Sequence, residues 1–381
     1  MKILEIIPFS SGFCGVWARA EKEAELLAKK GHEVVVFSSN IKRGTGNKEI
    51  AEKFDQKGKV KIQRFETFGN LGANAFFWDC SREAIELNPD VIITHAYRHY
   101  HSTLALKISQ KLKIPCILVT HAPFLDKKLR SKKLNFFVCV YDNFIGKRII
   151  NKYAKIFAIT KWEIPHLAKL NTKREKIVYS PNGIPEEFFS IKIPKRKSNE
   201  KILFLGRIAP IKDIETLIKA FKICSDKHKR VSLDFVGPIE EDYKNKILSL
   251  VKELNLEKKI NFLKPVYDLK EKIKIIDSHD LFILPSKREG MPQALIEAMA
   301  REKIVISSKT EGGKEIVEDG KTGYLFDVGN ESHLAEKIFL ALKKDKRNDK
   351  IKKNAREYVK QFSWEKLIEK INLLIQNETK T

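Results

Sequence analysis

Two glutamates, Glu289 and Glu297, stand eight positions apart in the stretch LPSKREGMPQALIEAMA, residues 284–300. An apolar run at 281–284 predicts a buried strand before them, and Pro292 predicts the first turn of a helix. Free backbone N–H groups at such a helix start can hold an anion or hydroxyl groups. Each carboxylate can accept both hydroxyls of a vicinal diol. The pair therefore suits a ligand with a sugar at one glutamate and a ribose at the other.

Glu297 also has a plainer interpretation. On a helical wheel it falls beside Gln293 and Arg301, at the polar edge of an apolar arc. A glutamate in that position is usually solvated and binds nothing. The spacing alone favours this second interpretation, and the wider pattern of the chain is needed to decide between them.

The neighbours of the two glutamates extend the pattern, with PS at 285–286, EG at 289–290 and EAM at 297–299. The stretch resembles the paired-glutamate signature of retaining GT-B glycosyltransferases of the large family four type, which includes glycosyl transferases group 1. The resemblance covers nearly the whole chain and is more specific in residues 201–326 than in residues 1–190. It implies transfer of a hexose or N-acetylhexosamine from a nucleotide sugar to a hydroxyl of a glycan, a lipid-linked molecule or a small molecule. Configuration would be retained, with no metal or other cofactor.

Short, continuous apolar runs recur along the chain, as parallel strands covered on both faces require. They lie at residues 3–8, 34–37, 91–94, 114–120, 156–160, 177–179, 202–205, 231–236, 259–263, 281–284, 305–307 and 324–326. Helical patterns lie between them, the clearest at 17–30, which ends at Gly31, and at 213–224. This alternation predicts an α/β chain of doubly wound sheets.

The linker IKIPKRKSN at 191–199 interrupts this pattern, which then restarts. We therefore expect two Rossmann-like domains, at 1–190 and 200–362. The resemblance implies the GT-B arrangement, in which the two domains face a cleft. It also implies that an amphipathic helix at 364–381 packs back on the first domain.

Composition excludes several classes of protein. The 381 residues exceed one typical domain and fit two. The sequence has no run of about 18 apolar residues, so we expect no transmembrane helix. The first residues, MKILEII, lack the long apolar core and cleavage site of a signal peptide, so we expect a cytoplasmic protein. The five cysteines are scattered without a CxxC pair, which argues against disulfides and a thiolate zinc site.

The net charge of +24, from 73 basic and 49 acidic residues, has three interpretations. The chain could bind nucleic acid, dock on anionic lipid or phosphorylated substrates, or carry a thermophile-like surface. Lysines are interleaved with acids along the whole chain, which favours the third, and no basic-aromatic motif supports nucleic acid. Residues 124–155 hold nine Lys or Arg and two Asp among apolar side chains, a net charge of +7. This segment is either a peripheral contact with the cytoplasmic face of an anionic membrane or a solvated helical face.

Arg207 follows the apolar run 202–205, and Lys212 precedes the next helix. Together they can grip a diphosphate, Arg207 as a planar fork and Lys212 as a point charge. Two fixed cations would stabilise a leaving nucleoside diphosphate without a metal. The pair resembles the family's Gly-Arg…Lys-Gly motif, with Asp213 in place of the usual glycine. Asp213 either caps the helix or places a carboxylate near the phosphate site.

The resemblance assigns further positions of this domain to the donor. Glu289 would bind sugar hydroxyls and Glu297 the ribose. Four more residues would face the nucleotide sugar: Gly237, Val266, Gly290 and Met291. Lys264 stands where the family often has glycine, so the identity of the base stays open.

In the first domain, Gly12 and Gly15 in the sequence SSGFCG occupy the place of the family's donor-facing glycine loop. His121, in VTHAP, matches the family's first-domain histidine, which implies contact with the donor sugar near the reacting carbon. Taken alone, His121 would be interpreted as a capping or core histidine.

Three more histidines, His95, His99 and His101, cluster after an expected strand. No carboxylate or thiol completes a metal set with them, and we expect an acceptor-side loop there. No Asp-x-Asp motif occurs, which agrees with transfer that needs no metal.

Two alternatives remain open. A sugar-nucleotide epimerase of the same fold would convert the donor without an acceptor. A basic nucleic-acid-binding protein would bind polynucleotides with a steep salt dependence and ignore nucleotide sugars.

Overall fold

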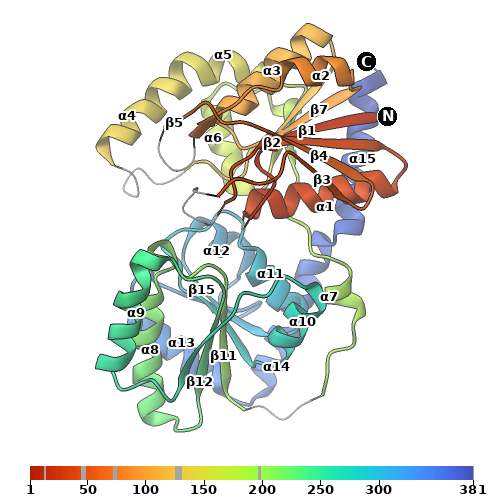
Figure 1. Ribbon diagram of the computed structural model, residues 1–381. Helices are drawn as coiled ribbons and strands as arrows, with labels where there is room; N and C mark the ends of the chain where they lie inside the picture. The colour runs from red at the N-terminus through yellow and green to blue at the C-terminus, as the bar shows by residue number, and fades with distance from the viewer. Residues whose placement is uncertain (13, 44–48, 72–74, 125–130, 196–198, 381) are drawn as a thin grey trace. The chain divides into compact units, whose positions relative to one another are not determined.

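The computed structural model describes residues 1–12, 14–43, 49–71, 75–124, 131–195 and 199–380. By their packing they form two compact units, one of Met1–Asn182 with Glu365–Thr381 and the other of Gly183–Trp364. Each unit is a mainly parallel sheet with helices packed against it (Figure 1). Within the described residues, no helix is both long and apolar enough to cross a membrane.

The first unit contains an eight-stranded sheet in the order β10-β9-β8-β7-β1-β2-β4-β3, parallel except for the β3–β4 pair. Its strands are β1 (Lys2–Phe9), β2 (Glu33–Ser39), β3 (Phe54–Lys57), β4 (Val60–Phe65), β7 (Val91–His95), β8 (Cys116–Val119), β9 (Lys155–Ala158) and β10 (Ile177–Tyr179), and β5 (Gly69–Leu71) pairs with β6 (Ala75–Phe77). Its helices are α1 (Gly15–Lys29), α2 (Ser81–Leu87), α3 (Tyr100–Leu112), α4 (Lys132–Val140), α5 (Lys147–Ile149), α6 (Ile164–Lys169) and α15 (Trp364–Lys380), with the π-helical turn η2 (Tyr141–Gly146) and the 3₁₀ turns η3 (Ile150–Lys152), η4 (Lys161–Glu163) and η5 (Arg174–Lys176).

The second unit contains a six-stranded parallel sheet in the order β13-β12-β11-β14-β15-β16. Its strands are β11 (Lys201–Leu205), β12 (Ser232–Val236), β13 (Ile260–Leu263), β14 (Leu281–Leu284), β15 (Ile304–Ser308) and β16 (Tyr324–Phe326). Its helices are α7 (Glu187–Ser190), α8 (Ile214–Lys227), α9 (Glu241–Glu253), α10 (Leu269–Asp277), α11 (Gln293–Ala300), α12 (Glu311–Ile316), α13 (Glu331–Leu342) and α14 (Lys346–Val359), with the 3₁₀ turns η6 (Pro210–Lys212) and η7 (Lys360–Phe362).

Each sheet has one point where the winding of the chain reverses. In the first sheet the chain leaves β1 toward β2 and leaves β7 toward β8 on the other side. In the second sheet the corresponding neighbours are β11 and β14. Ligands of open α/β sheets bind beyond the carboxyl ends of the strands at such a switch point, because the diverging connections leave room there. The topology therefore places a candidate site after β1 and β7 and another after β11 and β14.

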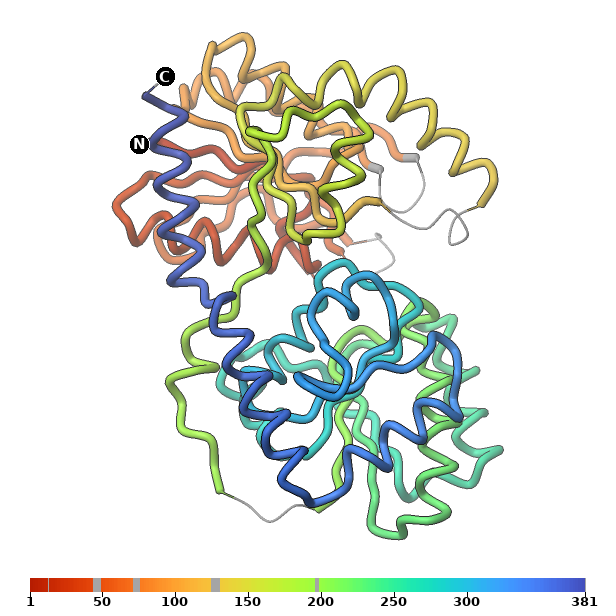
Figure 2. The backbone as a smooth tube through the Cα atoms, turned by 180° about the vertical axis from the view of Figure 1, so that it is seen from behind, coloured from red at the N-terminus to blue at the C-terminus, as the bar shows by residue number. Residues whose placement is uncertain are grey.

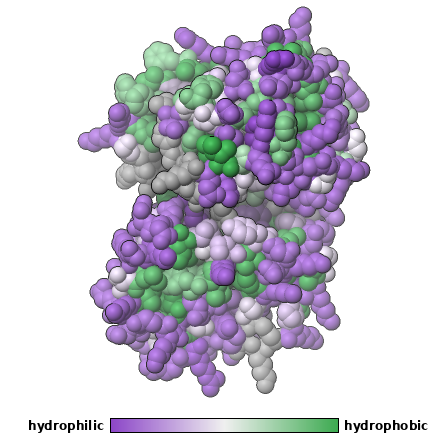
Figure 3. All heavy atoms as spheres, in the orientation of Figure 1, coloured by the Kyte–Doolittle hydropathy of each residue, from purple (hydrophilic) through white to green (hydrophobic). Residues whose placement is uncertain are grey.

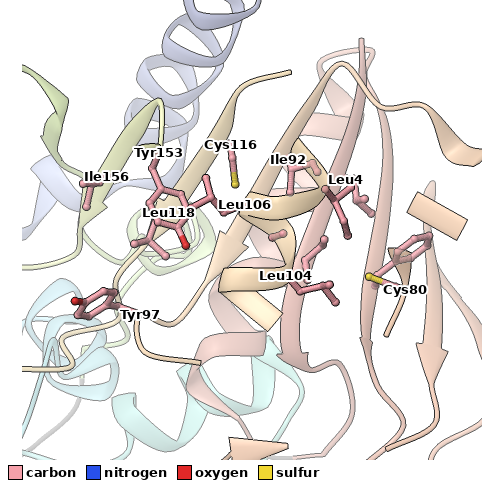
Figure 4. Close-up of a cluster of buried hydrophobic side chains, with 14 of the residues drawn as sticks. Leu4, Cys80, Ile92, Tyr97, Leu104, Leu106, Cys116, Leu118, Tyr153 and Ile156 are labelled. Atoms are coloured by element: carbon pink, nitrogen blue, oxygen red, sulfur yellow. The ribbon is translucent and has the colours of Figure 1, made fainter. Parts of the chain in front are cut away.

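The core of the first unit forms where α3 packs on the sheet. Figure 4 shows Leu4, Ile92 and Leu118 from three neighbouring strands together with Leu104 and Leu106 of α3, all buried. Every predicted apolar run overlaps a strand of the structure, because continuous runs suit strands covered on both faces. Strands β3, β4, β5 and β6 were not predicted. Strand β3 is exposed along its whole length and lacks an apolar run to mark it.

Two boundaries differ from the sequence prediction. The helix after the first glutamate begins at Gln293, and Pro292 precedes it with an extended backbone (ψ 101°) instead of opening its first turn. The segment before the linker packs with the second unit, although the sequence assigned it to the first. Arg301 explains this packing, since its Nη1 donates to the carbonyls of Phe188 at 3.0 Å and Ile191 at 2.6 Å.

Helix α15 is present where the sequence predicted a final helix, and it lies beside the N-terminal strand (Figures 1 and 2). Lys30 pairs with Glu369, and His32 Nε2 lies 2.7 Å from Asn372 Oδ1. These contacts attach the C-terminal helix to the end of α1.

Candidate active site

Lys212 and Glu289 meet at the switch point of the second sheet. Lys212 ends the turn after β11, and Glu289 lies in the loop after β14. Lys212 Nζ is 2.6 Å from Glu289 Oε1, and the same oxygen accepts a hydrogen bond from Ser286 Oγ at 2.5 Å. The side chains are only 21% and 10% exposed. The carboxylate of Glu289 is thus held between a cation and a hydroxyl, mostly out of solvent.

Backbone hydrogen bonds fix the loops that carry these side chains. The N–H of Lys287 donates to Ile211 O at 2.9 Å, which ties the loop after β14 to the turn after β11. The N–H of Gly312, in the first turn of α12, donates to Glu289 O at 3.3 Å. Three loops at the carboxyl edge of the sheet therefore act as one rigid frame around Glu289.

Two glycines at this edge are required by close backbone contact. A Cβ at Gly237 would lie 2.0 Å from Gly206 O, and a Cβ at Gly312 would lie 2.0 Å from Gly290 O. Gly237 also has a φ of +146°, which disfavours other residues. Met291 is buried next to Gly290. Gly237, Gly290 and Met291 thus lie in this frame, while Val266 follows β13 at the same edge of the sheet.

Arg207 and Asp213 flank the frame. Arg207 pairs with Glu240, and both side chains are substantially exposed, so this pair contributes little to stability. Asp213 has a φ of +52°, a left-handed conformation that favours glycine. Its Oδ2 accepts from Thr216 Oγ at 2.8 Å, and it makes no side-chain bond to the helix backbone. The helix-capping interpretation of Asp213 is therefore wrong.

Glu297 is buried on α11, with 3% of its surface exposed. The solvated side chain that the helical wheel favoured is therefore wrong. Lys272 of α10 places its Nζ 2.5 Å from Glu297 Oε2 as an ion pair, and Gln293 Nε2 donates to Glu297 Oε1 at 3.2 Å. The sequence analysis missed Lys272, because only the tertiary fold brings α10 over this face of α11.

In the first unit, His121 follows β8 in a strained turn. His121 and Ala122 both have left-handed backbones, with φ of +59° and +52°. The buried carboxylate of Glu163 holds the turn, since its Oε1 accepts from the N–H of Ala122 and its Oε2 from the N–H of Thr160, both at 2.9 Å. Two consecutive strained residues persist only where their surroundings enforce them, as in functional sites.

The ring of His121 belongs to a chain of buried groups. His121 Nε2 lies 3.0 Å from His95 Nδ1, and His95 Nε2 lies 3.5 Å from Glu5 Oε2. Burial lowers the pKa of both histidines well below the ordinary value, and neighbouring cationic groups lower it further. Both imidazoles are therefore neutral at pH 7. Glu5 lies within β1, and its only sequence signal was a charge inside an apolar run.

Of the other two histidines in this part of the sequence, His101 has a structural contact. His101 is buried, and its Nε2 lies 2.6 Å from His95 O. Burial lowers the pKa of His101 to about 3 and that of His99 to about 4. The expected acceptor-side loop is therefore wrong for His95 and His101, which lie in the core. Among the described residues, no three potential ligands cluster as a metal site.

Gly12 and Gly15 differ in whether the structure has room for a larger residue at their positions. Gly12 has a φ of +80°, and a Cβ there would lie 2.0 Å from Arg43 O. Gly15 opens α1 with nothing within 4 Å of the space for a Cβ. The structure thus explains Gly12 by local packing and leaves Gly15 unexplained.

Two family models match the chain. The model described as Glycosyltransferase Family 4 matches residues 14–188, and the model described as Glycosyl transferases group 1 matches residues 185–358. The chain is a glycosyltransferase. This glycosyltransferase is 26% identical over 370 residues to an uncharacterized glycosyltransferase of Methanocaldococcus jannaschii. The alignment covers 92% of this chain and 91% of that protein. It is 29% identical over 215 residues to the capsular polysaccharide biosynthesis glycosyltransferase CapM of Staphylococcus aureus, or 52% of this chain and 54% of that protein.

A solved structure agrees with the fold of the glycosyltransferase. HepE of Anabaena, crystallised with UDP and glucose, matches at a TM-score of 0.74 and 19% identity, over 99% of this chain and 100% of that chain. The predicted GT-B fold is therefore confirmed. The roles of the individual residues remain predictions.

Proposed function

We propose that this glycosyltransferase moves a hexose or N-acetylhexosamine from a nucleotide sugar to an acceptor hydroxyl, with retention of configuration and without a metal. The observation that carries the proposal is the contact between Lys212 and Glu289 at the switch point of the second sheet. A cation for phosphate and a carboxylate for hydroxyls stand side by side where an α/β sheet binds ligands. A nucleotide sugar is the ligand that needs both.

The cations would act on the leaving group. Arg207 and Lys212 would bind the diphosphate, Arg207 through its exposed planar fork and Lys212 from the rigid frame. Negative charge grows on this diphosphate as the bond to the sugar breaks, and fixed cations stabilise it without reorganising. A phosphate oxygen of the leaving group would accept the proton of the acceptor hydroxyl. We assign no covalent nucleophile.

The two glutamates would orient the donor. Glu289 would accept hydroxyls of the transferred sugar, and Glu297 those of the ribose. The close backbone packing of Gly237 on Gly206 and of Gly312 on Gly290 supports a nucleotide lying against the frame. Met291 would lie beside this nucleotide, and the base would lie toward Val266. In the first unit, neutral His121 would contact the donor sugar, near the backbone of Gly12 and Gly15.

A relative's name and a solved structure guide the choice of substrates. HepE was crystallised with UDP, so uracil is the first base to test. CapM is named for capsular polysaccharide biosynthesis, which makes a cell-envelope glycan the first acceptor class to test.

The first experiment is a thermal-shift panel of UDP, GDP, ADP and their sugar conjugates in EDTA. A ligand at about 100 times its Kd should stabilise the chain by about 2.7 kcal/mol. Arg207→Ala should lose the shift, while Lys314→Ala, which removes an exposed pair with Glu311, should keep it. No shift with any nucleotide, or a shift only after adding a divalent cation, would contradict the proposal. Product analysis then separates transfer from epimerisation.

We also propose that the α4 region contacts an anionic membrane surface. Phe136 and Phe137 are 66% and 56% exposed, and Leu134, Phe144 and Ile145 are also exposed. Figure 3 shows hydrophobic side chains among hydrophilic ones at the upper left, where this region lies. The cations Lys132, Lys133, Lys147, Arg148 and Lys152 share the segment, whereas residues 125–130 lie outside the described residues. Exposed aromatic residues beside cations suit the headgroup region of anionic lipid.

Vesicle sedimentation tests this contact. The chain should pellet with phosphatidylglycerol vesicles and not with phosphatidylcholine vesicles. Salt at about 0.5 M should weaken the binding to phosphatidylglycerol vesicles. Phe137→Ser should reduce pelleting. Phe54→Ser on β3 should not, although the side chain of Phe54 is exposed to a similar extent. Equal losses for both variants would show that the α4 region is not the contact.

A further inference from the structure

Glu5 is a charged side chain in an unusual place. It lies in the middle of β1, fully buried, with the backbones of β2 and β7 on either side. Among the described residues, neither of its carboxylate oxygens makes a hydrogen bond. His95 lies close to it on the sheet, with its Nε2 3.5 Å from Glu5 Oε2. A buried carboxylate without partners is costly, and a proton on it removes most of that cost.

The charges around Glu5 favour that proton. Glu23 of α1 is also fully buried and opposes a second negative charge. Arg19 of α1 attracts one, but its Nε faces Glu23 at 3.3 Å and its Nη1 donates to Ser180 O at 2.8 Å. Burial is the largest effect and raises the pKa of Glu5 well above its ordinary value, and Glu23 raises it further.

The two histidines are coupled through one hydrogen bond. His95 Nδ1 and His121 Nε2 lie 3.0 Å apart, and a bond between two neutral imidazoles contains a single proton. If His121 Nε2 carries it, His121 Nδ1 is left as an acceptor, and His95 points an N–H at Glu5. If His95 Nδ1 carries it, His121 Nδ1 carries a proton, and His95 Nε2 accepts from Glu5. A proton that Glu5 directs at His95 Nε2 therefore favours the second of these two tautomers of His121.

We propose that Glu5 and His95 are positioning residues that hold His121 in the tautomer with its proton on Nδ1. The proton of Glu5 is directed at His95 Nε2, 3.5 Å away, and keeps that nitrogen unprotonated, while His95 Nδ1–H donates to His121 Nε2. His121 Nδ1–H is then the atom offered at the carboxyl edge of the first sheet. The further role rests on the proposed function: this N–H donates to a hydroxyl oxygen of the donor sugar.

The test is nitrogen NMR of the full chain with ¹⁵N-labelled histidine, with His121→Asn to assign the signal. Wild type should show His121 protonated at Nδ1. Glu5→Gln should keep this tautomer, because its amide N–H₂ can donate to His95 Nε2, whereas Glu5→Leu and His95→Phe should release it toward the Nε2–H form. His333→Asn, a change in the second unit, is the control. Protonation at Nε2 in wild type, or no change in His95→Phe, overturns the proposal.

Kinetics add a readout of the role. His95→Phe should lower kcat/KM about tenfold, which corresponds to about 1.4 kcal/mol of activation free energy. Glu5→Gln should keep most of the wild-type kcat/KM. If the tautomer follows the expected pattern but His95→Phe transfers sugar as fast as wild type, the contact with the donor is wrong. If no nucleotide sugar binds the wild type at all, the proposed function fails, and the NMR result still decides the tautomer.

Discussion

Removing the cation beside Glu289 tests the proposed site most directly. In Lys212→Met, Glu289 keeps the hydroxyl of Ser286 as its one side-chain hydrogen-bond donor among the described residues, while nine-tenths of its side chain is out of solvent. Breaking a buried ion pair by removing one member costs about 3–5 kcal/mol. Lys212 is one-fifth exposed and Ser286 remains, so we expect about 2 kcal/mol. In a unit of about 180 residues this lowers Tm by about 4–8 °C.

Removing the charge of Glu289 should repair this loss. In Glu289→Gln the amide oxygen still accepts from Ser286 and Lys212, so stability should fall by less than about 1 kcal/mol while donor binding is lost. The double variant leaves no unpaired charge and should be more stable than Lys212→Met alone. The coupling energy between the two sites should be about 1–2 kcal/mol.

Urea unfolding followed by circular dichroism measures these values, with Tm as a second measure. The matched control is Lys314→Met, because Lys314 and Glu311 are both about half exposed and their pair should contribute less than about 0.5 kcal/mol. If Lys212→Met is as stable as this control, Glu289 does not depend on Lys212. If the double variant is no better than Lys212→Met, the loss comes from packing and the electrostatic reasoning fails.

Three further predictions follow from single positions. Gly312→Ala should destabilise the second unit and weaken nucleotide binding, because the new Cβ would meet Gly290 O at 2.0 Å, whereas Gly15→Ala has open space and should leave Tm unchanged. Burial lowers the pKa of His101 to about 3, so between pH 6.5 and about 3 only the unfolded chain protonates it, and stability is lost as pH falls through this range. The loss from pH 6.5 to 5 should be about 2 kcal/mol, and His101→Gln should lack this component in unfolding curves at both pH values. Asp213→Gly should keep or raise Tm, because glycine accepts the φ of +52° without strain; a large fall would show that the contact with Thr216 outweighs the strain.

The sequence predicted the parts of this chain that local patterns encode. Buried parallel strands have continuous apolar runs in the sequence, so the strands of the second sheet and most strands of the first could be predicted, together with their polar ends. The order of the second sheet then brings Arg207 and Lys212 to the same edge as Glu289, because neighbouring parallel strands end at the same edge. Edge strand β3 escaped prediction, since it is exposed and needs no apolar pattern.

What the sequence could not provide was the pairing of buried polar groups. Glu297 has a polar position on its own helix, yet α10 covers it and supplies Lys272. His95 reads as a loop histidine, yet it ends β7 and bonds to His121. Among these residues, only Glu5 could have been noticed in the sequence, because it is a charged residue between Leu4 and Ile6 in an apolar run. A charged residue at such a position is worth treating as functional before the structure is known.

The second unit pairs each of its three candidate site cations with a glutamate: Arg207 with Glu240, Lys212 with Glu289 and Lys272 with Glu297. An arriving diphosphate competes with these carboxylates for the cations, and a carboxylate that loses its cation then needs another partner. Hydroxyls of a sugar and a ribose can replace the cations at Glu289 and Glu297. A free diphosphate supplies only the anion, and a free sugar supplies only the hydroxyls. If the proposed function holds, these ion pairs favour the complete nucleotide sugar over either of its parts, because only the complete ligand would replace both the cation's partner and the carboxylate's partner at Glu289 and Glu297.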